Sequence, residues 1–184
     1  PIGKFFSKEE AEKVAAETGY VMKEDAGRGY RRVVASPKPV EVIENKTVEA
    51  LIKDGQIVIT VGGGGIPVFK NGNTLEGVAA VIDKDFASGV LAEMINADFL
   101  IILTAVEKIA LNYGKPNETW LDQVSVAEME QYMKEGHFAP GSMLPKVEAS
   151  VAFAKSGNGR VALVTSLEKA SSGIRGETGT HISL

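Results

Sequence analysis

The first residues that could do chemistry are three charged side chains in a row, Asp83, Lys84 and Asp85. They stand at the start of an apolar-striped run that predicts a helix from about residue 86 to residue 95. A carboxylate here complements the helix dipole, so Asp83 or Asp85 could simply cap the helix while Lys84 points to water. A cation in the first turn interacts unfavourably with the same dipole. The presence of Lys84 there is easier to understand if an anion binds at the helix start, held by Lys84 and by the free backbone amides.

A second lysine repeats this arrangement further along the chain. Lys146 follows a glycine- and proline-rich stretch, residues 136–145, and falls in the first turn of a helix predicted over residues 142–155. Ser142 can cap this helix, and an early proline is tolerated. Lys146 beside exposed amides would suit a phosphate site, although a solvent-facing lysine explains the same pattern. His137 is isolated, and we expect a structural hydrogen bond from it rather than catalysis.

A run of glycines, Gly62 to Gly65, directly follows the β-branched residues 56–61, which predict a strand. Successive glycines let backbone N–H groups turn toward an anion, so such a loop at the end of a strand can cradle phosphate. A permissive turn is the alternative reading. The loop matches neither a Walker loop, which needs Gly-Lys-Ser/Thr, nor the dinucleotide pattern Gly-x-Gly-x-x-Gly. A different phosphate-binding architecture is therefore expected.

The segment of residues 104–116 follows another predicted strand, residues 98–103. Loops at the carboxyl ends of parallel strands commonly receive a ligand. Backbone groups of this segment could read an adenine edge while Tyr113 packs on the ring, and an ordinary surface loop explains the sequence equally well.

The elements that precede these stretches predict a small appendage at the start of the sequence. Residues 7–18 begin with a capping box, Ser7 with Glu10, and end at Gly19, which predicts a helix. Two extended stretches on either side of a turn follow, and prolines stiffen the exit. The extended stretches are residues 20–23 and 31–35, and the turn is residues 25–29. A helix and a hairpin are therefore expected before residue 40.

From residue 40 onward, strands and helices alternate in short units, and a second capping box, Ser125 with Glu128, begins a helix that ends near Gly136. This alternation predicts an α/β fold, a three-layer sandwich with a largely parallel sheet, over residues 40–184. The predicted strands are residues 40–43, 56–61, 98–103, 160–165 and 180–184, and a further helix covers residues 48–53.

Composition excludes several classes of protein. The 184 residues carry a net charge of −4, and their basic side chains are mostly dispersed, so general nucleic-acid binding is not expected. No apolar run approaches the roughly 20 residues that a membrane span needs. The absence of cysteine excludes disulfides and thiol catalysis and suits a reducing cytoplasm. We expect a soluble, unexported protein whose charge is compatible with a nucleotide ligand.

Several of these stretches together closely resemble the carbamate kinases, members of the amino-acid-kinase fold family, and the match covers essentially the whole chain. Residues 136–146, GHFAPGSMLPK, are the most specific of them. The others are residues 24–31 (EDAGRGYR), 63–68 (GGGIPV), 81–85 (VIDKD) and 102–106 (ILTAV). The resemblance implies an amino-acid-kinase-like nucleotide-binding domain over residues 40–184. It makes residues 1–39 the protruding, lid-like subdomain that such kinases place over the active site.

The resemblance also implies roles for individual residues. Lys84 and Lys146 would contact the transferring phosphoryl group, and Asp85 would orient the two lysines. The loop of residues 104–116 would hold the adenosine, and the glycine loop would face the phosphates and the acceptor. The implied nucleotide-binding residues are Gly63, Gly64, Gly65, Asp83, Thr104, Ala105, Val106, Tyr113, Ser142 and Met143. No protein ligand for a metal is implied, because Mg²⁺ would be coordinated mainly by phosphates and water.

The implied activity is reversible phosphoryl transfer between ATP and carbamate, giving ADP and carbamoyl phosphate, in the cytoplasm and linked to arginine breakdown. Carbamate already presents an anionic oxygen, so no general base is needed, and lysines, loop amides and Mg²⁺ would neutralise the phosphoryl oxygens. The N-terminal half of the family fold does not precede Pro1. We therefore expect a piece of a longer polypeptide with exposed apolar edges, and a homodimer in the intact enzyme.

Three alternatives stay open from the sequence. The first is a related kinase that phosphorylates an amino-acid carboxylate, which would use the same electrostatics. The second is a nucleotide-binding fragment or module without turnover. The third is a plain structural domain, which would make both first-turn lysines and the glycine loop coincidences.

Overall fold

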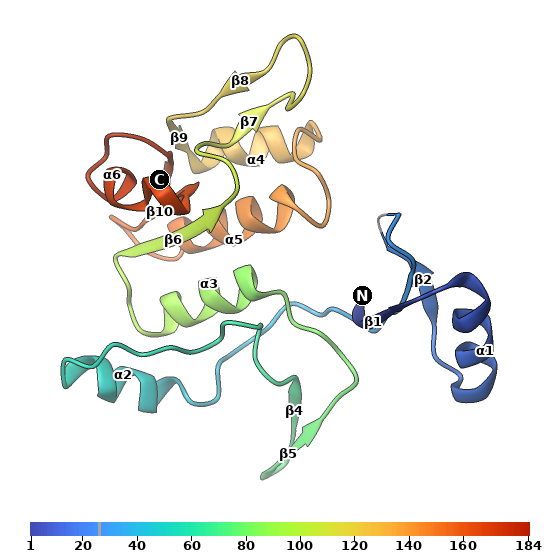
Figure 1. Ribbon diagram of the computed structural model, residues 1–184. Helices are drawn as coiled ribbons and strands as arrows, with labels where there is room; N and C mark the ends of the chain where they lie inside the picture. The colour runs from blue at the N-terminus through green and yellow to red at the C-terminus, as the bar shows by residue number, and fades with distance from the viewer. Residues whose placement is uncertain (26) are drawn as a thin grey trace. The chain divides into compact units, whose positions relative to one another are not determined.

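The chain forms two compact units in the computed structural model of Figure 1, which describes residues 1–25 and 27–184. Unit 1 consists of Pro1–Pro37 together with Ile66–Ile82, and unit 2 consists of Lys38–Gly65 together with Asp83–Leu184. The division expected from the sequence lies near residue 39 and places residues 66–82 in the second part. Each unit therefore contains two separate stretches of the sequence.

Unit 1 combines one helix with two small antiparallel sheets. Its elements are β1 (Ile2–Phe6), α1 (Lys8–Thr18), β2 (Met22–Glu24), β3 (Tyr30–Arg32), β4 (Val68–Asn71) and β5 (Thr74–Gly77). β3 lies between β1 and β2, and β4 pairs with β5 as a hairpin. The predicted α1 is confirmed: it begins with the capping box of Ser7 and Glu10 and ends at Gly19, whose φ of 73° is left-handed. Ala26 of the predicted turn lies outside the described residues.

The main sheet of unit 2 has its strands in the order β6-β10-β11-β9. Their bounds are β6 (Phe99–Thr104), β9 (Gln123–Ser125), β10 (Val161–Ser166) and β11 (Thr180–Ser183). β10 runs parallel to β6, β11 runs parallel to β9, and β10 and β11 are antiparallel to each other. The sheet is therefore mixed, and β11 lies inside it although it follows the other three strands in the sequence.

Helices cover the two faces of this sheet unequally. α3 (Lys84–Met94), α4 (Val126–Lys134) and α5 (Met143–Lys155) pack over one face, and the short α6 (Ala170–Ile174) packs on β10. The register explains the first layer: Ile102 pairs with Val164, and both are buried with Phe153 of α5 in one cluster. On the opposite face, Gly173 of α6 lies directly over Leu163. Burial of these apolar side chains is the main force that holds the layers together.

The remaining elements of unit 2 are small. They are α2 (Asn45–Lys53), β7 (Ala110–Leu111), β8 (Thr119–Trp120) and the 3-10 turn η1 (Leu167–Lys169). β7 and β8 pair as an antiparallel hairpin. Within residues 1–25 and 27–184, no helix has the length and apolar character needed to cross a membrane.

Two predicted strands, residues 40–43 and 56–61, are wrong, because the described structure has no strand at either place. Ile57 and Ile59 are each 97% exposed, and no backbone hydrogen bond joins residues 57–60 to any other described residue. β-branched residues favour an extended backbone, but a strand also needs a neighbour that completes its hydrogen bonds. No described segment supplies that neighbour here.

Candidate active site

Asp85 is shared by the two lysines that stood out in the sequence. Lys146 Nζ lies 2.8 Å from Asp85 Oδ2, and Lys84 Nζ lies 3.4 Å from Asp85 Oδ1. The side chains of Asp85 and Lys146 are only 9% and 15% exposed, whereas that of Lys84 is 58% exposed. An ion pair with so little water around it is electrostatically strong. The fold thus brings together the three residues that the sequence predicts to be catalytic.

The start of α3 fixes the direction of Asp85. Asp83 is the N-cap, and its Oδ1 accepts a hydrogen bond from the Asp85 backbone N–H at 2.8 Å. Capping by Asp83, one of the two readings of the sequence, is therefore observed. Lys84 is the first residue of the helix and keeps most of its surface in solvent, so a ligand at the helix start would meet an accessible ammonium group. A nucleotide contact by Asp83 stays a prediction.

Close packing of α3 against α5 lets Lys146 reach Asp85. Gly89 of α3 faces Ala149 of α5, and a Cβ added at Gly89 would lie 3.6 Å from the Ala149 carbonyl oxygen. Only small residues therefore separate the two helices at this point. The segment before α2 also contacts both helices, since Lys38 Nζ lies 3.4 Å from Glu148 Oε2 and 4.8 Å from the ring centre of Phe86.

The start of α5 differs from the prediction in one respect. Ser142 occupies the N-cap position, as expected, but its side chain makes no capping hydrogen bond. Its φ of −133° and ψ of −91° differ from the extended backbone of Ser125, which does cap α4 with φ −72° and ψ 155°. The predicted cap is thus wrong in its hydrogen bond, because the backbone turns the Ser142 side chain away from the first-turn amides.

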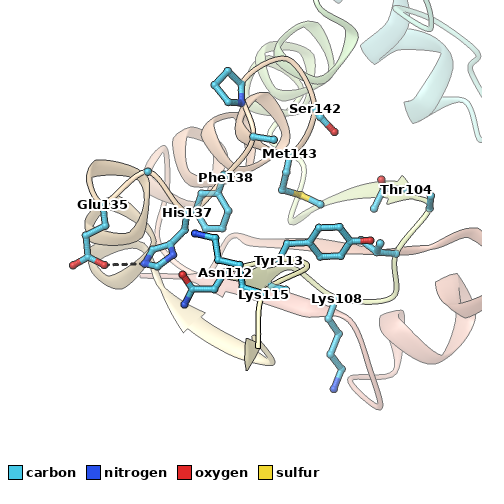
Figure 2. Close-up of a pocket in the computed structure, with 16 residues that line it drawn as sticks. Thr104, Lys108, Asn112, Tyr113, Lys115, Glu135, His137, Phe138, Ser142 and Met143 are labelled. Carbon is cyan, nitrogen blue, oxygen red and sulfur yellow. Dashed lines mark hydrogen bonds and ion pairs between the residues drawn. The ribbon is translucent and has the colours of Figure 1, made fainter. Parts of the chain in front are cut away.

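A pocket of about 580 Å³ opens beside the start of α5 (Figure 2). One wall comes from the segment after β6 and the other from the segment between α4 and α5. The lining residues are Thr104, Ala105, Val106, Lys108, Ala110, Asn112, Tyr113, Lys115, Glu135, Gly136, His137, Phe138, Ala139, Pro140, Ser142 and Met143. Thus six predicted nucleotide-binding residues line one cavity, whose size is typical of small-molecule sites: Thr104, Ala105, Val106, Tyr113, Ser142 and Met143.

The pocket combines an apolar interior with charged groups. Phe138 is buried in the core cluster, against which Met143 also packs, and both line the cavity. Lys115 adds positive charge to the lining, whereas the ammonium group of Lys108 is paired with Asp122. Figure 2 shows the Tyr113 ring among these side chains. An apolar cavity with a cationic group suits a ligand that has a flat ring and an anionic part.

His137 contacts protein groups on two sides. Its Nε2 lies 3.1 Å from Glu135 Oε2, drawn as a dashed line in Figure 2, and its ring packs edge-on against Tyr132 at 5.9 Å between centres. Hydrogen bonds hold the pKa of the Glu135 carboxyl below its usual range, and the bond from Gln131 contributes more than the bond from His137. These contacts fit the structural role expected for His137.

The glycine loop does not line this pocket. Gly64 and Gly65 have φ values of 91° and 84°, which L residues other than glycine rarely adopt, and Gly64 N–H donates to the Val61 carbonyl at 2.9 Å. In the described residues, Gly63, Gly64 and Gly65 make no hydrogen bond to Lys84 or Lys146. The positive φ values explain two of the glycines, and a phosphate cradle here stays a prediction.

The described residues contain no group of three or more His, Asp or Glu side chains arranged to hold a metal ion. Both Asp85 oxygens already face lysine ammonium groups. This carboxylate is therefore poorly suited to bind a cation.

Sequence reasoning missed some residues of the site. Glu135 lies just outside the stretch that drew attention, and Trp120 lies beyond the 104–116 segment, although its ring contacts Tyr113. Trp120 is the single tryptophan of the chain, which is the one signal that could have marked it.

The model of the amino acid kinase family matches residues 8–165 of this chain. Since this match covers most of the sequence, the chain belongs to the amino acid kinase family, as the resemblance implied. The α/β fold with a mixed sheet and flanking helices agrees with that assignment.

Within the family, the chain is similar to carbamate kinases. It is 65% identical over 182 residues to the carbamate kinase-like protein YqeA of Escherichia coli and 56% identical over 182 residues to the carbamate kinase of Clostridium perfringens. Carbamate kinase from Giardia lamblia bound to AMP-PNP has a similar structure, with a TM-score of 0.89 and 42% identity. These alignments cover 99–100% of this chain but 58% of each relative, so the chain spans somewhat more than half their length.

Proposed function

We propose that this chain carries the nucleotide- and phosphoryl-binding part of a carbamate kinase, which transfers a phosphoryl group reversibly between ATP and carbamate. The observation that carries the proposal is the Asp85 carboxylate shared by Lys146 and Lys84. Lys146 lies on the same helix as Met143, which lines the pocket, so a ligand in the pocket could extend its phosphates toward the lysines. The similar carbamate kinases support carbamate as the acceptor.

Charge is the main barrier to this reaction. In the direction of ATP formation, a β-phosphate oxygen of ADP attacks the phosphorus of carbamoyl phosphate, and the bond to the carbamate oxygen breaks. Carbamate leaves as an anion, so neither direction needs a general base. Lys84 and Lys146 stabilise the negative charge on the phosphoryl oxygens, and Asp85 holds the Lys146 ammonium group in place.

The pocket is the proposed site of the adenosine part. Its apolar interior and the exposed Tyr113 ring suit a purine, and Lys115 suits the negative charge that follows the ribose. The bound AMP-PNP of the similar Giardia lamblia carbamate kinase supports a nucleotide ligand, because AMP-PNP is an analogue of ATP.

Mg²⁺ would arrive with the nucleotide and neutralise part of the phosphate charge. The Asp85 carboxylate faces two lysines, so it does not suit the ion. Phosphate oxygens and water therefore remain its ligands in this proposal, as magnesium often prefers.

The resemblance supports three further parts of the proposal. Residues 1–39 act as a lid, the intact protein is a homodimer, and the reaction takes place in the cytoplasm. Gly63, Gly64 and Gly65 take the phosphate side of the site, where their small size lets backbone amides approach an anion.

The decisive test is ATP formation from ADP and carbamoyl phosphate with Mg²⁺, for this chain, for Lys146→Ala and for Lys155→Ala. Lys155 is a matched control because it lies on the same helix and pairs with Glu130 at the surface. We expect Lys146→Ala to lower the rate about 100-fold or more and Lys155→Ala to leave it unchanged. Equal losses in both variants would contradict the assignment of Lys146.

Direct ADP binding, measured by calorimetry, separates the alternative of a module without turnover. If the chain binds ADP but forms no ATP, it supplies the nucleotide site and needs further residues for catalysis. If it does not bind ADP, the proposed function is wrong. Competition between carbamate and amino-acid carboxylates as acceptors distinguishes a carbamate kinase from a related amino-acid kinase.

A further inference from the structure

Tyr113 stands at the tip of the loop that joins β7 to β8. The residues on both sides of it have left-handed backbones, with φ 52° at Asn112 and φ 74° at Gly114. The backbone N–H of Lys115 donates to the Asn112 carbonyl at 2.9 Å and closes the turn. The backbone on each side of Tyr113 therefore has a sharply defined direction.

A second set of contacts fixes the loop below the tip. The Gly114 N–H donates to Glu118 Oε2 at 2.7 Å, and the Glu118 N–H donates to the Lys115 carbonyl at 3.0 Å. These bonds hold the backbone but do not touch the Tyr113 ring. Tyr113 is 65% exposed although it lines the pocket, so its ring needs another support to keep one position.

Trp120 provides that support from β8. Its ring meets the Tyr113 ring edge to face, with 6.2 Å between centres and 82° between planes. Trp120 does not line the pocket itself, but it pairs with Ala110, which does. An edge-to-face contact leaves at least one face of the Tyr113 ring uncovered. Trp120 is thus placed to act on a ligand through Tyr113.

We propose that Trp120 is a positioning residue for nucleotide binding, which holds the Tyr113 ring so that its open face receives a purine base. This inference rests on the proposed function, because it takes the pocket as the nucleotide site. Base stacking on an aromatic side chain contributes strongly to binding only when the ring is already in place, since fixing a mobile ring costs entropy. The proposal therefore concerns the affinity for nucleotide and not the transfer step.

The experiment measures ADP affinity by calorimetry for the full 184-residue chain and for Trp120→Leu, Trp120→Phe, Tyr113→Leu and the double variant Trp120→Leu/Tyr113→Leu. We expect Trp120→Leu to weaken ADP binding about three- to tenfold, and Trp120→Phe to restore most of the affinity because it keeps an aromatic ring. In the Tyr113→Leu background, Trp120→Leu should have no further effect, since the ring through which it acts is gone. Merely structural damage would weaken binding equally in both backgrounds.

Fluorescence provides a readout that needs no nucleotide. Trp120 is the only tryptophan in the sequence, so the emission of the chain reports its surroundings alone. Tyr113→Leu should change this emission in the absence of ligand, and unchanged emission would overturn the contact. If the unmodified chain fails to bind ADP, the proposed function fails. If it binds ADP and Trp120→Leu binds ADP as tightly, only the role of Trp120 is overturned.

Discussion

Two regions of unit 2 contain equally apolar sequences and reach opposite outcomes. The β6-β10-β11-β9 sheet and its helices bury their side chains in one cluster. Asp85 and Lys146 belong to α3 and α5, two of the helices that pack on this sheet. Residues 56–61 carry isoleucine, valine and threonine as well, yet Ile57 and Ile59 are almost fully exposed and lead into a glycine loop that does not line the pocket.

The difference shows that a strand is not a local property. A helix forms its hydrogen bonds within one segment, whereas a strand needs a second segment at its edge. β10 has a neighbour on each side, and residues 56–61 have none among the described residues. The Asp85–Lys146 pair therefore lies beside strands that have their neighbours among the described residues.

The largest expected effect is on the free energy of unfolding, and it appears when a buried and an exposed isoleucine are each replaced by alanine. Ile182 of β11 is fully buried, so Ile182→Ala should lower the free energy of unfolding by about 2 to 5 kcal/mol. Ile57→Ala removes the same atoms from an exposed site and should change it by less than about 0.5 kcal/mol. Urea unfolding of both variants measures this, and similar losses would mean that residues 56–61 are buried in solution.

The second prediction concerns the charged pair. Asp85→Ala leaves the Lys146 ammonium group in a mostly buried place without its partner, and we expect a loss of about 2 to 4 kcal/mol in the free energy of unfolding. Glu148→Ala is the control, because it breaks the more exposed ion pair with Lys38 and should cost less than about 1 kcal/mol. Comparable losses in urea titrations would show that the Asp85–Lys146 pair is as solvated as a surface pair.

The third prediction tests the exposed segment itself. An uncharged, β-branched run with unpaired backbone groups tends to associate with copies of itself. We expect the double variant Ile57→Lys/Ile59→Lys to associate several-fold less than the unmodified chain in sedimentation velocity at high concentration. Val40→Lys is the matched control, since Val40 is exposed but lies outside the segment. Unchanged association in the double variant would show that the surface responsible for self-association lies outside residues 56–61.

The fourth prediction separates two serines at helix starts. Ser125 caps α4 and exchanges hydrogen bonds with Glu128, so Ser125→Ala should cost about 1 kcal/mol of unfolding free energy. Ser142 has the same position on α5 without a capping hydrogen bond, so Ser142→Ala should cost close to nothing. Thermal or urea unfolding measures both, and a large loss for Ser142→Ala would reveal a cap that forms in solution.

The smallest expected effect depends on pH. Hydrogen bonds from the Ser125 hydroxyl and amide hold the pKa of Glu128 below its usual range. Because the folded pKa is lowered, this stabilisation is present above the unfolded value of about 4.3 and is lost as the pH falls through the folded pKa. The stability difference between the unmodified chain and Glu128→Gln should therefore shrink between about pH 6 and about pH 3. A constant difference would contradict the shift.

The sequence predicted α1 to α5 well because their signals are local, whereas α6 was not predicted. The capping boxes at Ser7 and Ser125 located the starts of α1 and α4, and apolar periodicity located α3. β1 and the β4–β5 hairpin were missed, since their residues show no clear alternation and depend on pairing. The strand predicted over residues 56–61 was wrong for the same reason, because β propensity does not show whether a neighbouring strand is available.

For the site, charge at helix starts identified Lys84 and Lys146, and the resemblance supplied their link through Asp85. The 2.8 Å distance between Lys146 Nζ and Asp85 Oδ2 could not be predicted from the spacing of residues in the sequence, because it depends on how closely α3 and α5 pack. Trp120 was missed because a contact behind a pocket residue leaves no motif in the sequence.

The place of β11 inside the sheet has a consequence for the order of events during protein synthesis. β6, β9 and β10 all leave the ribosome before β11, yet β11 is the single sheet neighbour of β9 among the described residues. At about 5 to 20 residues per second, β9 waits for roughly 3 to 12 s before its partner exists. Any factor that binds nascent chains therefore meets an unfinished sheet during this interval, and a premature stop before residue 180 would remove an interior strand.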